Sequence, residues 1–96
     1  MAVKFDDAFH DRVEAHIHLS NDQKTTAGPE GTNASMMYAS ARFNAWLSAA
    51  RFESAEAMAA KKKETIDFFL AGYRDLLEGN IDDYIKNFDR FMKPKA

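Results

Sequence analysis

The 96-residue sequence contains no cysteine. This absence excludes disulfide bonds, metal sites built on thiolates, and catalysis by a cysteine nucleophile. Proteins of a reducing compartment have no need of disulfides, and we therefore expect a cytoplasmic location.

The sequence also lacks any long apolar run. Near the N-terminus Asp6 and Asp7 interrupt the apolar residues, so neither a signal peptide nor a membrane-spanning helix is predicted. An excess of basic charge is missing too: the formal net charge is −2, and the lysines cluster only at Lys61–Lys63 and near the C-terminus. Because nucleic-acid binding requires a basic face, we expect neither nucleic acid nor a membrane as partner.

Glycine and proline are scarce, with four and two residues, and their positions divide the chain. Gly28, Pro29 and Gly31 predict a long loop over residues 23–32, and Gly79 predicts the end of a helix. Between these points apolar residues recur every three or four positions, which is typical of helices. The sequence therefore predicts a single all-α domain of residues 1–96, with a flexible tail at 93–96. Its small bundle of four helices is expected over about 5–22, 33–52, 55–78 and 81–92.

Aromatic residues are abundant at 12% of the chain, which is more than a small core readily hides. Tyr38, Phe52 and Phe68 fall away from the main apolar stripes of their predicted helices. Exposed aromatic side chains tend to mark interfaces, so these three residues predict a homo-oligomer, most simply a dimer, or an unidentified protein partner. In the alternative interpretation, neighbouring helices cover them within the monomer.

Three residues of the first predicted helix are candidate metal ligands. His10, Glu14 and His18 are spaced by four, so they line one side of the helix over about 12 Å. A single ion would be held by only two of them, and no histidine occurs outside this helix to complete a site. The alternative interpretation is a solvated polar face.

Arg42, Asn44 and Arg51 are the candidate residues for binding a small ligand or an anion. Asn44 and Arg51 share a side of their predicted helix, whereas Arg42 lies nearly opposite, and arginines there can equally pair with carboxylates. Nucleophile motifs, glycine-rich phosphate loops and zinc spacings are absent, so no catalytic residue and no cofactor are predicted.

Two strings of the sequence point to a family. Residues 41–45 read ARFNA and residues 80–88 read NIDDYIKNF. With them the chain resembles a small bacterial family of uncharacterised helical proteins, a domain of unknown function. The resemblance implies a helical bacterial domain and supplies no catalytic residues. Together with the residue patterns it leads us to expect a non-enzymatic helical interaction or scaffold domain that self-associates.

Overall fold

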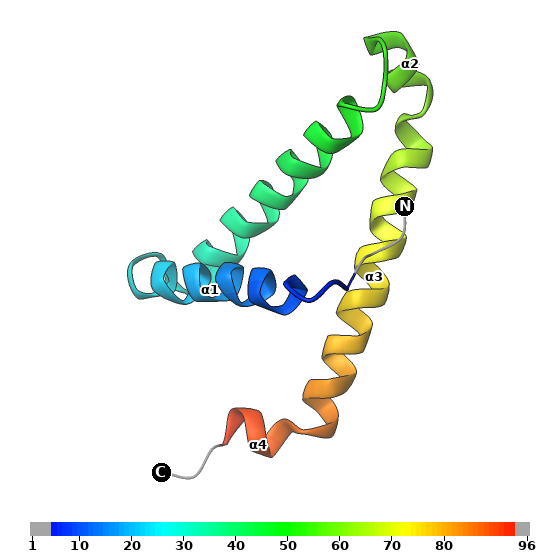
Figure 1. Ribbon diagram of the computed structural model, residues 1–96. Helices are drawn as coiled ribbons and strands as arrows, with labels where there is room; N and C mark the ends of the chain where they lie inside the picture. The colour runs from blue at the N-terminus through cyan, green and yellow to red at the C-terminus, as the bar shows by residue number, and fades with distance from the viewer. Residues whose placement is uncertain (1–4, 94–96) are drawn as a thin grey trace. The chain divides into compact units, whose positions relative to one another are not determined.

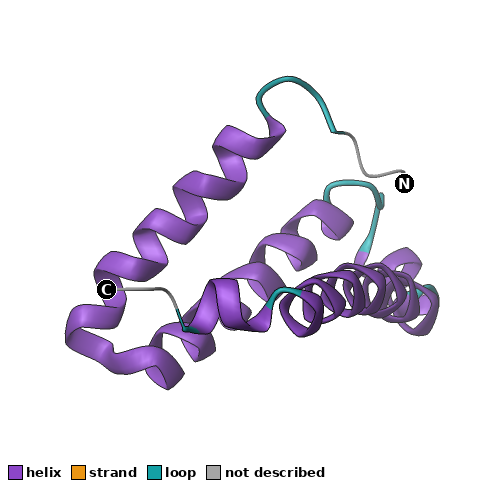
Figure 2. Cartoon of the chain, turned by 90° about the horizontal axis from the view of Figure 1, so that it is seen from below, coloured by secondary structure: helices purple, strands orange, loops and turns teal. Residues whose placement is uncertain are grey.

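The computed structural model describes residues 5–93, and these residues form helices and connecting turns with no strand among them (Figures 1 and 2). The predicted all-α class is therefore confirmed. The last residues of the predicted tail, 94–96, lie outside the described part of the chain. The chain divides into two units, Met1–Ala45 and Trp46–Ala96. In chain order the helices are α1 (Phe9–Ala49), α2 (Ala55–Ala60), α3 (Lys62–Lys86) and α4 (Phe88–Met92).

Helix α1 begins at Phe9, later than the predicted start at residue 5. Asp6 fixes this start, because its carboxylate accepts hydrogen bonds from the backbone N–H of Ala8 at 3.2 Å and from the guanidinium of Arg12 at 3.1 Å. The carbonyl of Asp6 accepts a further bond from the N–H of Phe9 at 3.0 Å. A carboxylate in this place satisfies a free amide and interacts favourably with the helix dipole.

The loop predicted over residues 23–32 is not formed, since α1 continues on both sides of a single irregular residue. Gly28 has φ 78° and ψ 166°, a backbone conformation that is essentially restricted to glycine. Pro29 follows it, and a proline at the first position of a helical segment loses no hydrogen bond. Figure 1 shows the consequence: α1 consists of two straight segments that meet at a bend in the cyan part of the ribbon.

Thr32 lies just after this bend inside α1, whereas the sequence predicted it as the last residue of a loop. Its side chain is buried, with 4% of the residue exposed, and its hydroxyl Oγ1 has no hydrogen-bond partner within residues 5–93. A helical threonine usually donates to the carbonyl four residues earlier. Here that carbonyl belongs to Gly28, whose non-helical ψ turns it away from the helical direction. The bend thus leaves a buried hydroxyl unsatisfied.

The second unit begins with the last turn of α1 and continues through α2, α3 and α4. Ser54 caps α2, because its side chain accepts a hydrogen bond from the N–H of Ala57 at 3.1 Å, and the helix starts at residue 55 as predicted. The helix predicted over 55–78 is nevertheless interrupted at Lys61, where φ is −109°. One predicted helix is therefore two, the short α2 and the first part of α3.

Helix α3 runs through Gly79, so the break predicted between residues 78 and 81 is wrong. The side-chain amide of Asn80 donates to the carbonyl of Leu76 at 2.7 Å, which is a bond within a continuing helix and not a cap. The helix ends instead at Asn87, whose amide donates to the carbonyl of Asp83 at 3.2 Å and to its carboxylate at 2.8 Å. The predicted last helix is reduced to α4.

Within residues 5–93 neither unit has an apolar core. Among the described residues the only buried ones are Thr32 and Ser48, and both are polar. The better covered apolar side chains are only half-buried: Phe9 in the first unit, and Leu47, Phe52, Met58, Phe69 and Phe91 in the second. The large apolar side chains of both units are therefore at least partly exposed.

The conformation of Gly28 generates a first prediction. We expect Gly28→Ala to lower the free energy of unfolding by about 1–2 kcal/mol, because alanine is strained at this φ and ψ. Gly31→Ala is the matched control: Gly31 is helical and an added Cβ would meet only the Cβ of Ala27 at 3.5 Å. It should raise the stability by about 0.5–1 kcal/mol. Urea unfolding followed by circular dichroism measures the free energy of unfolding of both variants. Equal changes in the two variants would contradict the non-helical conformation of Gly28.

The buried hydroxyl of Thr32 generates a second prediction. Thr32→Val keeps the shape of the side chain and removes the unsatisfied group, so we expect it to stabilise the protein by about 1 kcal/mol. Thr32→Ala should destabilise it, because packing is lost as well. Thermal unfolding of the two variants beside the unmodified protein checks this. A valine variant as unstable as the alanine variant would mean that the hydroxyl is bonded.

Candidate functional site

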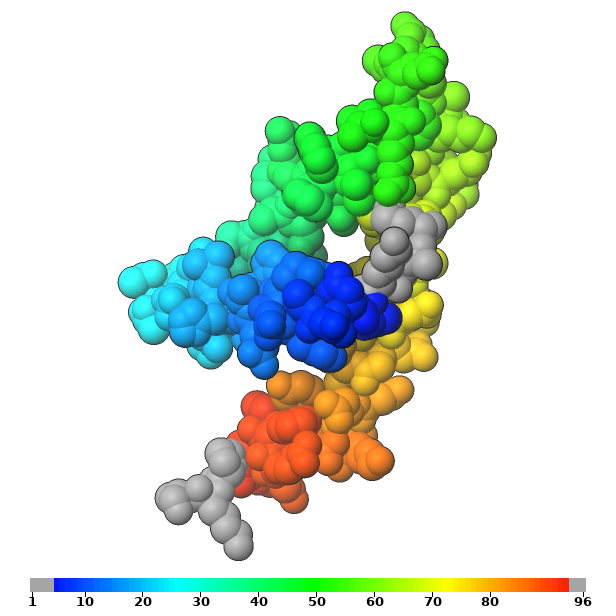
Figure 3. All heavy atoms as spheres, viewed as in Figure 1, coloured from blue at the N-terminus to red at the C-terminus, as the bar shows by residue number. Residues whose placement is uncertain are grey.

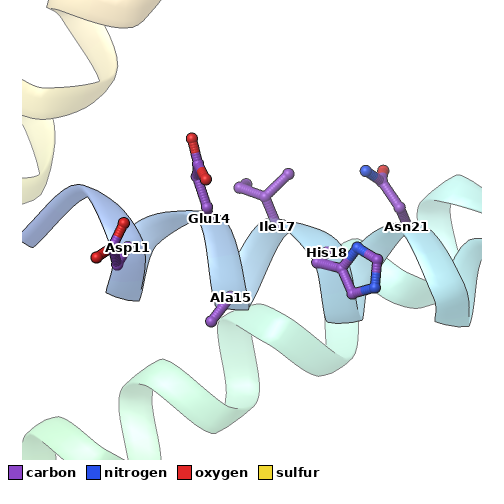
Figure 4. A pocket seen from close by; sticks show the side chains of 6 residues that line it. All are labelled: Asp11, Glu14, Ala15, Ile17, His18 and Asn21. Atoms are coloured by element: carbon purple, nitrogen blue, oxygen red, sulfur yellow. The ribbon is translucent and has the colours of Figure 1, made fainter. Parts of the chain in front are cut away.

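A row of polar side chains follows one side of the first segment of α1. It lines a shallow, open depression whose residues are Asp11, Glu14, Ala15, Ile17, His18 and Asn21 (Figure 4). All six come from consecutive turns of one helix, so the depression has no second wall of functional groups. Figure 4 shows that the carboxylates of Asp11 and Glu14 and the imidazole of His18 point in different directions. These groups do not converge on a common ligand.

The metal site predicted from His10, Glu14 and His18 finds no support in this geometry. Within residues 5–93 no three histidine or carboxylate side chains are grouped so that they could hold one ion. His18 instead faces Asp22, with Nε2 at 3.7 Å from the carboxylate and both side chains exposed. His10 lies edge-on to the ring of Phe9, with the centroids 5.5 Å apart. His10, Glu14 and His18 are all exposed, so the row is a polar surface of α1.

Two of the candidate ligand-binding residues belong to the first unit and the third to the second. Arg42 and Asn44 are in the second segment of α1, where Arg42 is exposed and Asn44 is half-buried. Two residues apart on a helix, their side chains project about 160° apart. Arg51 lies beyond the end of α1, in the turn that leads to α2. Arg42 and Asn44 therefore cannot grip one small ligand from the same side of α1.

The three residues predicted to form an interface differ in exposure. Tyr38, in the first unit, is 69% exposed, and Phe68, in the second, is 45% exposed. The ring of Phe68 packs edge-on against that of Phe69 at 5.5 Å, so part of it is covered within its own helix. Phe52 belongs to the short connection between α1 and α2, and its side chain is half-buried. Tyr38 and Phe68 are accordingly available for contacts with another molecule.

A row of exposed apolar side chains also runs along α3. Six side chains of α3 spaced by three or four residues fall within about 80° of one another around the helix axis. Each of them is between 43% and 61% exposed. We name this set the α3 stripe; it consists of Ile66, Leu70, Tyr73, Leu77, Ile81 and Tyr84. Its spacing could be found in the sequence, but its exposure could not.

Comparison with known proteins places the chain in a family. A family described as a protein of unknown function, DUF3144, matches residues 9–85. The chain belongs to this family. The match begins at the first residue of α1 and ends just before the end of α3, so it includes the bend at Gly28 and the whole α3 stripe. The resemblance inferred from the sequence is thereby confirmed.

A solved structure is similar over nearly the whole chain. It is the NMR structure of the protein NB7890A from Shewanella sp., with 35% sequence identity and a TM-score of 0.77, covering 98% of this chain and 100% of that one. No curated protein matches. Within residues 5–93 we find no helix with the length and apolar character that a bilayer span requires.

The open polar row on α1 generates a third prediction. A ligand that binds the folded state raises its stability, but two side chains at most could reach one ion here. We therefore expect that equimolar Zn²⁺ leaves the unfolding temperature of the tag-free protein unchanged. An unfolding temperature that rises by several degrees with Zn²⁺ would support the metal site, provided that the rise disappears in the variant His18→Ala and persists in the control Asn21→Ala.

Proposed function

We propose that this member of the family is a non-enzymatic helical interaction or scaffold domain that works in a self-associated form. The observation that supports it most directly is the exposure of the large apolar side chains in both units, with no apolar residue buried among those described. Surfaces of this kind mark sites of protein association.

The free energy of folding explains why a chain with such exposed apolar side chains should associate. Fixing the backbone costs about 1–2 kcal/mol per residue, and apolar burial has to offset most of this cost. Burying one large apolar side chain contributes about 1.5–3 kcal/mol. Half-exposed side chains obtain only part of this gain, and isolated helices are marginally stable in water. Association that covers the apolar surfaces supplies the missing stabilisation.

We propose that the helical bundle predicted from the sequence forms when copies of the chain associate. Helices α1 and α3 are long enough to form a bundle when copies combine, and Tyr38, Phe52 and Phe68 are the off-stripe aromatic residues that we propose for its interfaces. A dimer is the simplest closed arrangement. A further, unidentified protein could use the surface that remains.

The non-enzymatic part of the proposal rests on the sequence, which contains no recognisable set of reactive groups. A bacterial cytoplasmic setting agrees with the complete absence of cysteine and with the similar protein from Shewanella sp..

Sedimentation equilibrium tests self-association and is the fourth prediction. At about 100 μM, well above the dissociation constants of specific interfaces, the mass should clearly exceed the 10.9 kDa of one chain. Dilution should lower both the mass and the helical signal in circular dichroism, because folding and association are coupled. A fully helical species with the mass of one chain at every concentration would refute the proposal.

A further inference from the structure

We propose that the α3 stripe is covered by the α3 stripe of a second copy of the chain, with the two helices antiparallel. With the two-fold axis beside residues 71 and 72, Lys62 and Lys63 of each copy lie beside Glu78 and Asp83 of the other, and the two stripes face each other over residues 66–77. This inference rests on the self-association proposed above, and it adds the surface, the partner and the direction of pairing.

The first support is the size of the apolar surface. The α3 stripe extends over about 27 Å of helix. In Figure 3 the orange atoms toward the C-terminal end of α3 are visible on the face that is drawn. Aromatic and aliphatic side chains that are half exposed offer roughly 70–120 Å² each, so the stripe with its flanking residues offers about 600–900 Å² per copy. A stable interface typically buries about 800 Å² on each partner.

The second support is the distribution of charge beside the stripe. Lys62 and Lys63 flank it at its N-terminal end, one on each side, because they project about 50° either way from its centre line. Glu78 and Asp83 flank it toward the C-terminal end at about 110° on either side. Asp67 and Arg74 also flank the stripe, at about 80° and 60° from its centre line on the side of Lys63. Because Lys62 and Lys63 outweigh Asp67, the N-terminal end of the stripe is net basic, whereas Glu78 and Asp83 make the C-terminal end acidic.

Two of these four flanking charges are unpaired in the single chain: within residues 5–93 neither Lys62 nor Glu78 forms an ion pair. Lys63 pairs with Asp67 at 2.8 Å, but its side chain is 89% exposed. Asp83 accepts a hydrogen bond from Asn87 and keeps its negative charge for a partner. All four groups can therefore interact with a second copy.

The direction of pairing follows from these charges. If two copies of α3 ran parallel, lysines would face lysines and carboxylates would face carboxylates. Antiparallel copies bring the basic end of each helix to the acidic end of the other, and two-fold symmetry forms every such contact twice. Lysines at the start of a helix are also unfavourable beside its own dipole, whereas the C-terminal end of an antiparallel neighbour attracts them.

A second copy fits the stripe better than the first unit of the same chain does. Between residues 5 and 45 the basic side chains are Arg12, Lys24 and Arg42, which are far apart in the sequence and outnumbered by acidic residues. No pair of neighbouring basic residues is available there to meet Glu78 and Asp83. The matching basic pair is found in α3 itself.

Two charge-reversed chains test the inference. One carries Lys62→Glu and Lys63→Glu, and the other carries Glu78→Lys and Asp83→Lys. In an antiparallel dimer each variant alone places like charges together at both ends, so we expect its dissociation constant to rise about tenfold or more at low salt. An equimolar mixture should recover the affinity of the unmodified protein, because the two variants complement each other at both ends. Sedimentation with one chain fluorescently labelled measures both effects.

The matched control carries Asp75→Lys and Asp82→Lys. It changes the net charge by the same amount as the acidic-end variant, but on the side of α3 opposite the stripe, and it should associate like the unmodified chain. A variant that unfolds alone and regains helicity on mixing supports the pairing, and one that does not recover overturns it. If the unmodified protein dimerises and both reversed chains dimerise equally well, the antiparallel pairing is wrong while self-association stands. A strictly monomeric unmodified protein would instead refute self-association itself.

Discussion

A helix satisfies the hydrogen bonds of its own backbone, but it cannot cover its own apolar side chains. Each long helical segment is subject to that constraint, and no apolar side chain between residues 5 and 93 is buried within either unit. The segments are held by local devices: Asp6 at the start of α1, Ser54 before α2 and Asn87 after α3. Such caps contribute about 1 kcal/mol each, so they determine where helices begin and end without replacing a core.

The boundaries that the sequence predicted correctly are those with a local cause. Ser54 accepts a hydrogen bond three residues away, and this pattern can be recognised without knowledge of the rest of the fold. Gly79 and Gly28 show the limit of such patterns, because glycine permits a break without requiring one. Around Gly79 the apolar residues of the α3 stripe stay in phase, so the helix continues. At Gly28 one residue changes conformation and the helix resumes directly.

The candidate sites also show what residue spacing in the sequence cannot predict. The spacing of His10, Glu14 and His18 correctly indicates that they line one helix, but a metal site needs ligands that converge from several directions. Convergence depends on which helices meet, and no single-helix pattern contains that information. The sequence showed the apolar spacing of α3, although it divided the helix at Gly79, and this spacing cannot say whether the apolar side is covered by the same chain or by another one.

The charges beside the α3 stripe have a different physical role from the stripe itself. Apolar side chains attract one another without directional preference, so a stripe alone would pair in either direction and with many partners. Exposed ion pairs contribute little affinity, but facing like charges oppose the wrong alignment. Lys62 lies at the edge of an apolar surface, which is an unfavourable place for a charge in a monomer. In an antiparallel pair the side chain of Lys62 would stabilise the contact. Its aliphatic stem covers apolar surface, while its ammonium group reaches the acidic end of the neighbouring helix. The apolar stripe then supplies the stability of the pair, and the flanking charges select its direction.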